Sequence, residues 1–271
     1  MNYWVHNLDP VIFQIWGPLA VRWYGLAYLL GFLCGYLLLL RMSKRGEFVV
    51  PSRELGNFMI HIAIYGVFLG GRLGYVLLYA WDIFIHDPLF LLRVWEGGMA
   101  SHGGMLGVIL VILWTAWKKK ISFWNITDGL ALVAPIGLFF GRIANFINGE
   151  LWGRPTDVPW AVIFPQTEDA IPTPRHPSQL YEAFGEGLIL FTALWLIRRT
   201  ARGKREGVLS AAFLILYAVA RIASEFFREP DSTIYFGWLT KGQLYSSVMV
   251  VVAIVIIVSK RLWQRDDGIK E

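Results

Sequence analysis

Seven long stretches of apolar residues alternate with short polar segments along the 271 residues of the chain. A helix needs about 20 mostly apolar residues to cross a bilayer. Each stretch approaches that length, so each predicts a membrane-spanning helix. The predicted spans are residues 19–40, 57–80, 99–117, 124–143, 180–197, 207–227 and 242–259. The apolar segment Val11–Trp16 is too short to span, and we expect it at the membrane surface.

Lysine and arginine gather after the first, third, fifth and seventh stretches, as they do in the cytoplasmic loops of membrane proteins. Sixteen of the 25 basic residues lie in these four runs, which are Arg41–Arg53, Lys118–Lys120, Arg198–Arg205 and Lys260–Lys270. Seven spans with the N-terminus outside place all four runs in the cytoplasm, whereas an even number of spans would not. The pattern therefore predicts an all-α integral membrane protein with seven transmembrane helices and a cytoplasmic C-terminus.

No polar linker divides the sequence, so we expect residues 1–271 to form one polytopic membrane domain. The outer connection at residues 144–179 contains six prolines, too many for one helix. It is expected to form a small, irregular or β-containing cap on the periplasmic side, inserted between spans four and five. The N-terminus lacks the basic region of a cleaved signal peptide, so the first span should remain in the mature protein.

Composition narrows the function classes. The chain is 56% hydrophobic and only 17% charged, and its mean hydropathy is +0.50. The net charge of +5 does not indicate a nucleic-acid partner, because the basic residues lie in short runs between apolar segments. The single cysteine, Cys34, excludes an internal disulfide and a cysteine metal cage, and we interpret it as a packing residue.

Glycines recur four residues apart within the predicted spans, which lets membrane helices approach closely. We interpret most of them as packing positions. These pairs are Gly31 and Gly35, Gly66 and Gly70, Gly70 and Gly74, Gly103 and Gly107, and Gly137 and Gly141.

Charged residues at the outer end of the sixth stretch form one polar stripe. At 100° per residue, Tyr217, Arg221, Glu225 and Arg228 fall within about 80° of one another on a helix. Arg221 and Glu225 are four residues apart and can form an ion pair. The pair could simply lock the helix bundle, but a second arginine nearby would leave spare positive charge for a ligand.

The fourth stretch ends in GRIANFINGELWGRP, residues 141–155, with Arg142 and Asn145 on one helix face. A guanidinium donates two parallel hydrogen bonds to a phosphate, so Arg142 and Arg221 on different helices predict a clamp for an anionic lipid headgroup. The alternative is that Arg142 extends to the membrane surface as an interface residue.

His102 stands beside Gly103 and Gly104 at the start of the third stretch. A histidine can give or take a proton near neutral pH, although His102 could also serve only to begin the helix. His176 can equally mark the entrance of the fifth span, where Pro177 suits a first helical turn. Tyr24 suits the aromatic belt at a membrane interface.

Two rival classes remain open, a lipid transporter and an assembly protein that uses its charges only for folding. A transporter should carry polar residues through the full depth of a span, whereas here they gather in the outer half and the last span is bare from Val248 to Val258. The motifs of serine hydrolases, zinc proteases and P-loop enzymes do not occur.

Several of these segments together resemble the prolipoprotein diacylglyceryl transferase family, in the same order and over nearly the whole chain. They are RWYGL (22–26), VFLGGRLGYVL (67–77), HGGMLG (102–107), GRIANFINGELWGR (141–154), RHPSQLYE (175–182) and RIASEFFREP (221–230).

The resemblance implies a multi-pass enzyme of the bacterial inner membrane whose active site faces the periplasm. Such an enzyme moves the sn-1,2-diacylglyceryl group of phosphatidylglycerol onto the lipobox cysteine thiol of a prolipoprotein. The product is a thioether, sn-glycerol 1-phosphate leaves, and neither a metal nor another cofactor is expected. This is the first step of bacterial lipoprotein maturation.

The resemblance also implies which residues form the site. Arg142, Arg221, His102 and Tyr24 would be catalytic, and Arg142 would also bind phosphatidylglycerol. The other lipid-binding residues implied are Asn145, Glu150, Gly153, Tyr217, Glu225 and Arg228. Either His102 or Glu150 could take the proton of the thiol, and His102 is favoured.

Overall fold

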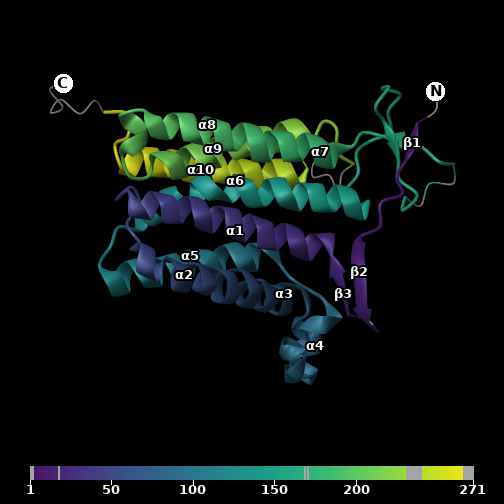
Figure 1. Ribbon diagram of the computed structural model, residues 1–271, viewed down its shortest axis with the longest axis horizontal. Helices are drawn as coiled ribbons and strands as arrows, with labels where there is room; N and C mark the ends of the chain where they lie inside the picture. The colour runs from purple at the N-terminus through teal and green to yellow at the C-terminus, as the bar shows by residue number, and fades with distance from the viewer. Residues whose placement is uncertain (1–2, 18, 168, 170, 230–239, 265–271) are drawn as a thin grey trace. The chain divides into compact units, whose positions relative to one another are not determined.

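The computed structural model describes residues 3–17, 19–167, 169, 171–229 and 240–264 (Figure 1). They form two compact units, one from residues 1–35 and 128–271 and the other from residues 36–127. Helices α1 (Trp23–Lys44) and α6 (Phe123–Asn148) each contribute to both units. Each unit is described by itself.

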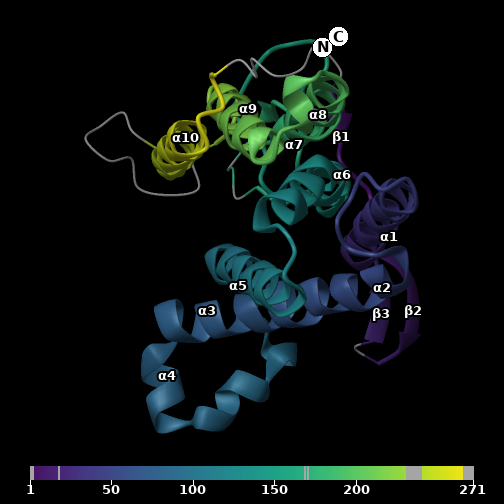
Figure 2. The same ribbon diagram turned by 90° about the vertical axis from the view of Figure 1, so that its left-hand side faces the viewer.

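The first unit is a bundle of apolar helices. It holds the first part of α1, most of α6, a continuous helix at Ser178–Arg199, α9 (Val208–Ser224) and α10 (Lys241–Ser259). The continuous helix comprises α7 (Ser178–Glu182), the π-helical η4 (Ala183–Ile189) and α8 (Leu190–Arg199), followed by the short η5 (Arg202–Lys204). Helix α9 packs against both α8 and α10 (Figure 2).

Two contacts position neighbouring helices in this bundle. A Cβ on Gly31 of α1 would lie 3.1 Å from the Cα of Gly137 of α6, so these helices approach closely there. At the start of α9, the buried carboxylate of Asp128 accepts hydrogen bonds from the backbone N–H groups of Gly207 and Ser210, both at 2.7 Å. The carboxylate thereby caps the positive end of α9.

The non-helical parts of the first unit form two small sheets. Strand β4 (Val162–Ile163) pairs in parallel with β1 (Trp4–Val5) and antiparallel with β5 (Pro174–Arg175). Strands β2 (Val11–Trp16) and β3 (Leu19–Arg22) form an antiparallel hairpin. The interface segment predicted at Val11–Trp16 is therefore a strand, and α1 begins only at Trp23, four residues after the predicted start of the first span.

The second unit contains the end of α1, a continuous helix from Ser52 to Tyr79, and α5 (Ser101–Lys119). The continuous helix comprises α2 (Ser52–His61), the π-helical η1 (Ile62–Leu69) and α3 (Gly70–Tyr79). Three short helices connect it to α5: α4 (Trp81–His86), η2 (Pro88–Leu92) and η3 (Val94–Glu96). Helix α5 lies along η1 and α3 (Figure 2).

Arg72 of α3 organises the connection between α3 and α5. Its side chain is buried and donates hydrogen bonds to five backbone carbonyls, at Phe90, Leu91, Arg93, Gly97 and Gly98. The guanidinium also lies 4.7 Å from the ring centre of Phe90. Backbone carbonyls thus provide the hydrogen-bond acceptors for Arg72, and we assign this arginine of the second span a structural role.

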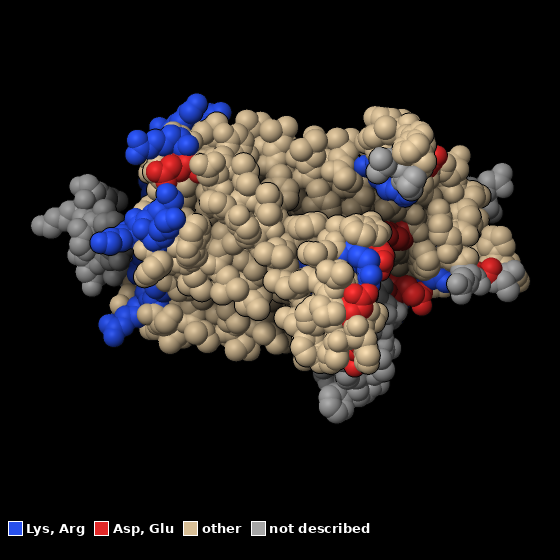
Figure 3. All heavy atoms as spheres, turned by 90° about the horizontal axis from the view of Figure 1, so that it is seen from below, with Lys and Arg blue, Asp and Glu red and all other residues tan. Residues whose placement is uncertain are grey.

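Five of the described helices are long and apolar enough to cross a membrane: Trp23–Lys44, Ser52–Tyr79, Phe123–Asn148, Ser178–Arg199 and Gly242–Ser259. The sides of the helices present large surfaces without acidic or basic side chains (Figure 3). The protein is therefore a mostly helical membrane protein. The other two predicted spans correspond to α9, which is apolar but has 17 residues, and to α5.

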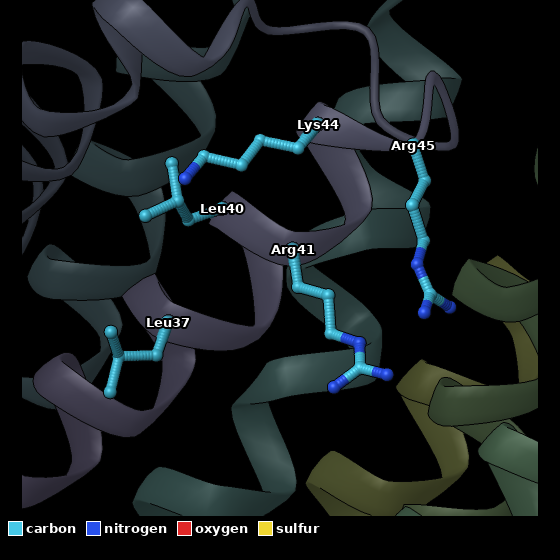
Figure 4. Close-up of a pocket in the computed structure, with 5 residues that line it drawn as sticks. All are labelled: Leu37, Leu40, Arg41, Lys44 and Arg45. Carbon is cyan, nitrogen blue, oxygen red and sulfur yellow. The ribbon is translucent and has the colours of Figure 1, made fainter.

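The cytoplasmic end predicted for α1 carries a shallow cavity of about 390 Å³. Leu37, Leu40, Arg41, Lys44 and Arg45 line it. The Lys44 side chain extends away from those of Arg41 and Arg45, so the three cations do not converge on one point (Figure 4). We interpret them as the basic end of a span.

Candidate active site

Arg142 in α6 lies against two buried glutamates of the neighbouring helix. Its Nε and Nη2 atoms donate to Oε2 of Glu186 at 3.1 and 3.0 Å. Its Nη1 atom lies 3.0 Å from Oε2 of Glu182. Because Glu182 and Glu186 are four residues apart, they share one face of the helix and hold one guanidinium between them.

Glu182 also connects Arg142 to two further arginines. Arg228 Nη1 donates to its Oε1 atom at 3.0 Å, and Arg221 Nη1 lies 3.7 Å from the same oxygen. Arg221 forms the predicted ion pair with Glu225, with Nη2 and Oε1 at 2.6 Å. We call this set of six residues the arginine cluster: Arg142, Glu182, Glu186, Arg221, Glu225 and Arg228.

Two expectations about these charges need correction. Helix α9 ends at Ser224, so Arg228 does not continue the helical stripe but follows a turn and forms an antiparallel bridge with Gly153. We also expected an excess of positive charge near Arg221. The described arginine cluster has no such excess, because its three arginines are matched by three glutamates. Isolated charges are too costly in an apolar interior, so the fold supplies a partner for each.

The members of the arginine cluster differ in exposure. The side chains of Arg142 and Arg221 are each 14% exposed, whereas those of Glu182 and Glu186 are 0% exposed. The side chains of Glu225 and Arg228 are each 5% exposed, so Arg142 and Arg221 are the most accessible members of the cluster. A guanidinium also carries more N–H donors than the three contacts of Arg142 use.

Next to the arginine cluster, three amide side chains surround Glu150. Asn145 and Asn148, near the end of α6, donate to its Oε1 atom at 2.6 and 3.4 Å. Gln179 of α7 donates to the Glu150 backbone carbonyl at 2.7 Å. We call Asn145, Asn148, Glu150 and Gln179 the amide cluster.

The turn after α6 has an unusual backbone. Gly149 and Leu151 have φ values of 64° and 59°, and this left-handed region is uncommon for leucine. Gly153 is enclosed by backbone, since a Cβ there would lie 2.5 Å from the His176 carbonyl oxygen and 2.6 Å from that of Phe227. This tight turn fixes Glu150, and it explains structurally why a glycine stands at 153.

The remaining predicted site residues lie in different places. Tyr24 is in the first turn of α1, 5.3 Å from Tyr28 between ring centres, and lines a shallow cavity of about 420 Å³. Tyr217 is half-buried on α9, one turn before Arg221. His102 lies in the first turn of α5, in the unit of residues 36–127, so its role remains a prediction.

His176 marks the entrance of the Ser178–Arg199 helix. Its ring packs 5.3 Å from Phe227 and 5.8 Å from Tyr181, and its backbone carbonyl accepts from Gly153. Burial lowers the pKa of His176 below its ordinary value. Pro177 precedes the first helical residue rather than occupying the first turn.

Sequence reasoning missed Glu182, Glu186 and Gln179 as members of this site. Glu182 stood within the segment RHPSQLYE, and Glu186 follows four residues later in an apolar stretch. A carboxylate inside a predicted span is costly enough to indicate function, and that signal could have identified both glutamates. Gln179 carried no comparable signal. Among the described residues, no three His, Cys, Asp or Glu side chains are grouped as metal ligands would be.

The fold and the site define a class: a helical membrane protein whose interior holds three arginines paired with three glutamates. Comparison with known proteins specifies it further. The family profile described as prolipoprotein diacylglyceryl transferase matches residues 10–259.

Bacterial relatives named phosphatidylglycerol–prolipoprotein diacylglyceryl transferase match over nearly their whole length. The protein of Mannheimia succiniciproducens is 46% identical over 256 residues, which cover 93% of this chain and 92% of the relative. That of Idiomarina loihiensis is 47% identical and covers 95% of both chains. That of Rhodospirillum centenum is 48% identical, covering 93% of this chain and 91% of the relative. The chain belongs to the prolipoprotein diacylglyceryl transferase family and is a transferase.

Proposed function

We propose that this protein transfers the sn-1,2-diacylglyceryl group of phosphatidylglycerol to the lipobox cysteine thiol of a prolipoprotein. The reaction takes place at the periplasmic side of the bacterial inner membrane, within seven spans whose C-terminus is cytoplasmic. The names of the relatives support the two substrates.

One observation supports the proposal most directly. The side chains of Arg142 and Arg221 are partly accessible, while buried glutamates hold their guanidinium groups through ion pairs. A lipid phosphate entering from the bilayer would accept hydrogen bonds from N–H groups that are already oriented. The buried carboxylates leave the arginines little freedom to lose on binding, which favours a preorganised site.

The reaction needs this positive charge most at its transition state. The thiolate sulfur attacks the glyceryl carbon, a C–S bond forms, and the C–O bond to phosphate breaks with its electron pair. The leaving sn-glycerol 1-phosphate gains one negative charge relative to the phosphodiester. Arginines fixed in a water-poor site stabilise that developing charge.

The proton of the thiol needs an acceptor, because the thiolate is the reactive form. We assign this role to His102, with the Glu150 carboxylate as the alternative. Tyr24, Asn145, Gly153, Tyr217, Glu225 and Arg228 complete the proposed site. Asn145 orients the Glu150 carboxylate, and Glu225 holds Arg221.

The test is direct. Purified protein is mixed with phosphatidylglycerol and a synthetic lipobox peptide, and mass spectrometry monitors the peptide. We expect a diacylglyceryl adduct and free glycerol phosphate, both abolished in Arg142→Ala. A protein that forms neither product would refute the transferase proposal, and an Arg142→Ala variant that only expresses poorly would favour the assembly-protein alternative.

The proton acceptor is tested separately. If His102 accepts the proton, His102→Gln lowers turnover most near neutral pH, where a neutral imidazole can act as a base and the thiol is still mostly protonated, and the difference shrinks at low pH, where the imidazole is protonated. Near-normal turnover of His102→Gln across the pH range, alongside an inactive Arg142→Ala, would remove His102 from this role and leave Glu150.

A further inference from the structure

The amide cluster contains two hydrogen-bond acceptors that the described protein does not satisfy. The Oδ1 atom of Asn148 and the Oε1 atom of Gln179 are buried, and neither has a donor among the described residues. Buried polar atoms are satisfied in the great majority of cases, so two on adjacent helices require an explanation.

These two oxygens are acceptors by necessity. Each amide nitrogen donates to Glu150, at its carboxylate or its backbone carbonyl, and neither group can donate in return. Reversing either amide would place oxygen against oxygen. The orientation of both amides is therefore set by their partners, and each leaves its oxygen for an outside donor.

The two residues with unsatisfied oxygens lie near the arginine cluster in the sequence of their helices. Gln179 precedes Glu182 by three residues on the same helical face, and Asn148 follows Arg142 by six residues, about 9 Å along the axis of α6. A ligand that binds the arginines through an anion can therefore extend toward the two oxygens. That ligand must carry hydroxyl or amine donors a few bonds from its negative charge.

We infer that Asn148 and Gln179 form a subsite for the hydroxyl groups of the phosphoglycerol headgroup, next to the arginines that bind its phosphate. The inference rests on the proposed function and adds the residues that bind the hydroxyl groups of the leaving glycerol phosphate. A hydroxyl donates to an amide oxygen, and the phosphoglycerol headgroup carries its two hydroxyls on the two carbons that follow the one bonded to the phosphate oxygen. The subsite makes the enzyme selective, among anionic phospholipids, for a headgroup with two hydroxyls. A headgroup without hydroxyls would leave the amide oxygens of Asn148 and Gln179 without hydrogen-bond donors.

The experiment compares two anionic lipids of equal headgroup length, phosphatidylglycerol and phosphatidyl-1-propanol, which lacks both headgroup hydroxyls. We expect kcat/KM of the wild-type protein to favour phosphatidylglycerol by at least about tenfold. Gln179→Met and Asn148→Leu each reduce that preference to within about threefold by lowering kcat/KM for phosphatidylglycerol alone. Asn57→Leu, which changes an exposed asparagine of α2, keeps the full preference.

Each outcome decides the inference. Variants that keep the wild-type preference, or that lose activity equally toward both lipids, overturn it, as does a wild-type protein that does not distinguish the lipids. If Gln179→Met does not fold, Asn148→Leu tests the subsite from the other helix. A wild-type protein inactive toward phosphatidylglycerol would instead refute the proposed function.

Discussion

At the scale of the residue, Glu186 is the most informative member of the arginine cluster. It is fully buried, and its Oε2 atom accepts from both Nε and Nη2 of Arg142. These paired bonds fix the plane of the guanidinium, while Glu182 takes the third nitrogen. Arg142 therefore cannot rotate without breaking buried charge-assisted hydrogen bonds.

We predict that Glu186→Gln lowers kcat/KM by about 100-fold, because a misplacement of about 1 Å in a catalytic group has effects of that order. If Glu186 acts through Arg142, it adds little to the loss in an Arg142→Lys background. Steady-state kinetics of the single and double variants measure this coupling.

The matched control is Glu54→Gln, which removes the carboxylate that pairs with Lys119 in the other unit. We expect it to leave kcat/KM unchanged. Full activity of Glu186→Gln, or strictly additive losses in the double variant, would contradict a positioning role for Glu186.

At the scale of the element, glycines set the distance between α3 and α5. A Cβ on Gly103 would lie 2.6 Å from the Cα of Gly74 and would also meet the carbonyl oxygen of Gly70. Both obstacles are backbone and cannot move aside. Three of the five predicted glycine pairs lie where η1 and α3 meet α5, whereas a Cβ on Gly137 or Gly141 would meet no atom within 4 Å.

We predict that Gly103→Ala destabilises the protein by about 1–3 kcal/mol, the usual cost of overpacking. Thermal unfolding in detergent measures the change. Gly56→Ala on α2 is the control, because a Cβ there meets no atom within 4 Å. Equal melting temperatures of the two variants would show that α3 and α5 separate at little cost.

The segment between α6 and α7 depends on Arg175. This arginine donates to both carboxylate oxygens of Asp169, at 2.9 and 3.0 Å, and to the Gly153 carbonyl at 3.1 Å. Its hydrogen bonds hold the pKa of Asp169 below its ordinary value of 3.8. A carboxyl whose pKa is lowered by folding stabilises the fold above its unfolded pKa, and that contribution is lost as the pH falls toward the folded pKa.

We predict that unfolding between about pH 3 and pH 5 depends less steeply on pH in Asp169→Asn than in the wild-type protein. The melting temperature of the variant is lower at neutral pH and converges with that of the wild type under acid conditions. A constant difference across this pH range would exclude a contribution from this ion pair.

At the scale of the whole molecule, the distribution of basic residues predicts the orientation in the membrane. The ends of α1, α5 and α8 carry Arg41 and Lys44, Lys118 and Lys119, and Arg198 and Arg199 in their last turns. Glu182 and Glu186 of the arginine cluster lie near the other end of the Ser178–Arg199 helix from Arg198 and Arg199. The positive-inside rule then predicts that the arginine cluster lies on the periplasmic side.

Single cysteines test this orientation in a Cys34→Ala background. We expect a membrane-impermeant maleimide to label Ile171→Cys in intact spheroplasts and Ala201→Cys only after lysis, because both positions are exposed but on opposite sides. Labelling in the reverse order would invert the predicted topology.

The sequence by itself determined the helices, their approximate limits and the membrane class, because apolar length and the cost of charge in lipid act locally along the chain. The start of α1 was misplaced, since Leu19, Ala20 and Val21 are apolar and suit a hairpin strand as well as a helix. The pair of Arg221 and Glu225 was predictable, because helical geometry alone brings residues four apart together.

Only the tertiary structure decided which charges meet across helices. It placed Glu182 against three arginines and Glu186 behind Arg142, and it left two amide oxygens of Asn148 and Gln179 without a donor among the described residues. These relations depend on how α6, α7 and α9 pack and rotate against one another. No local pattern encodes that rotation, whereas the free energy of a buried charge depends on every neighbour that the packing supplies.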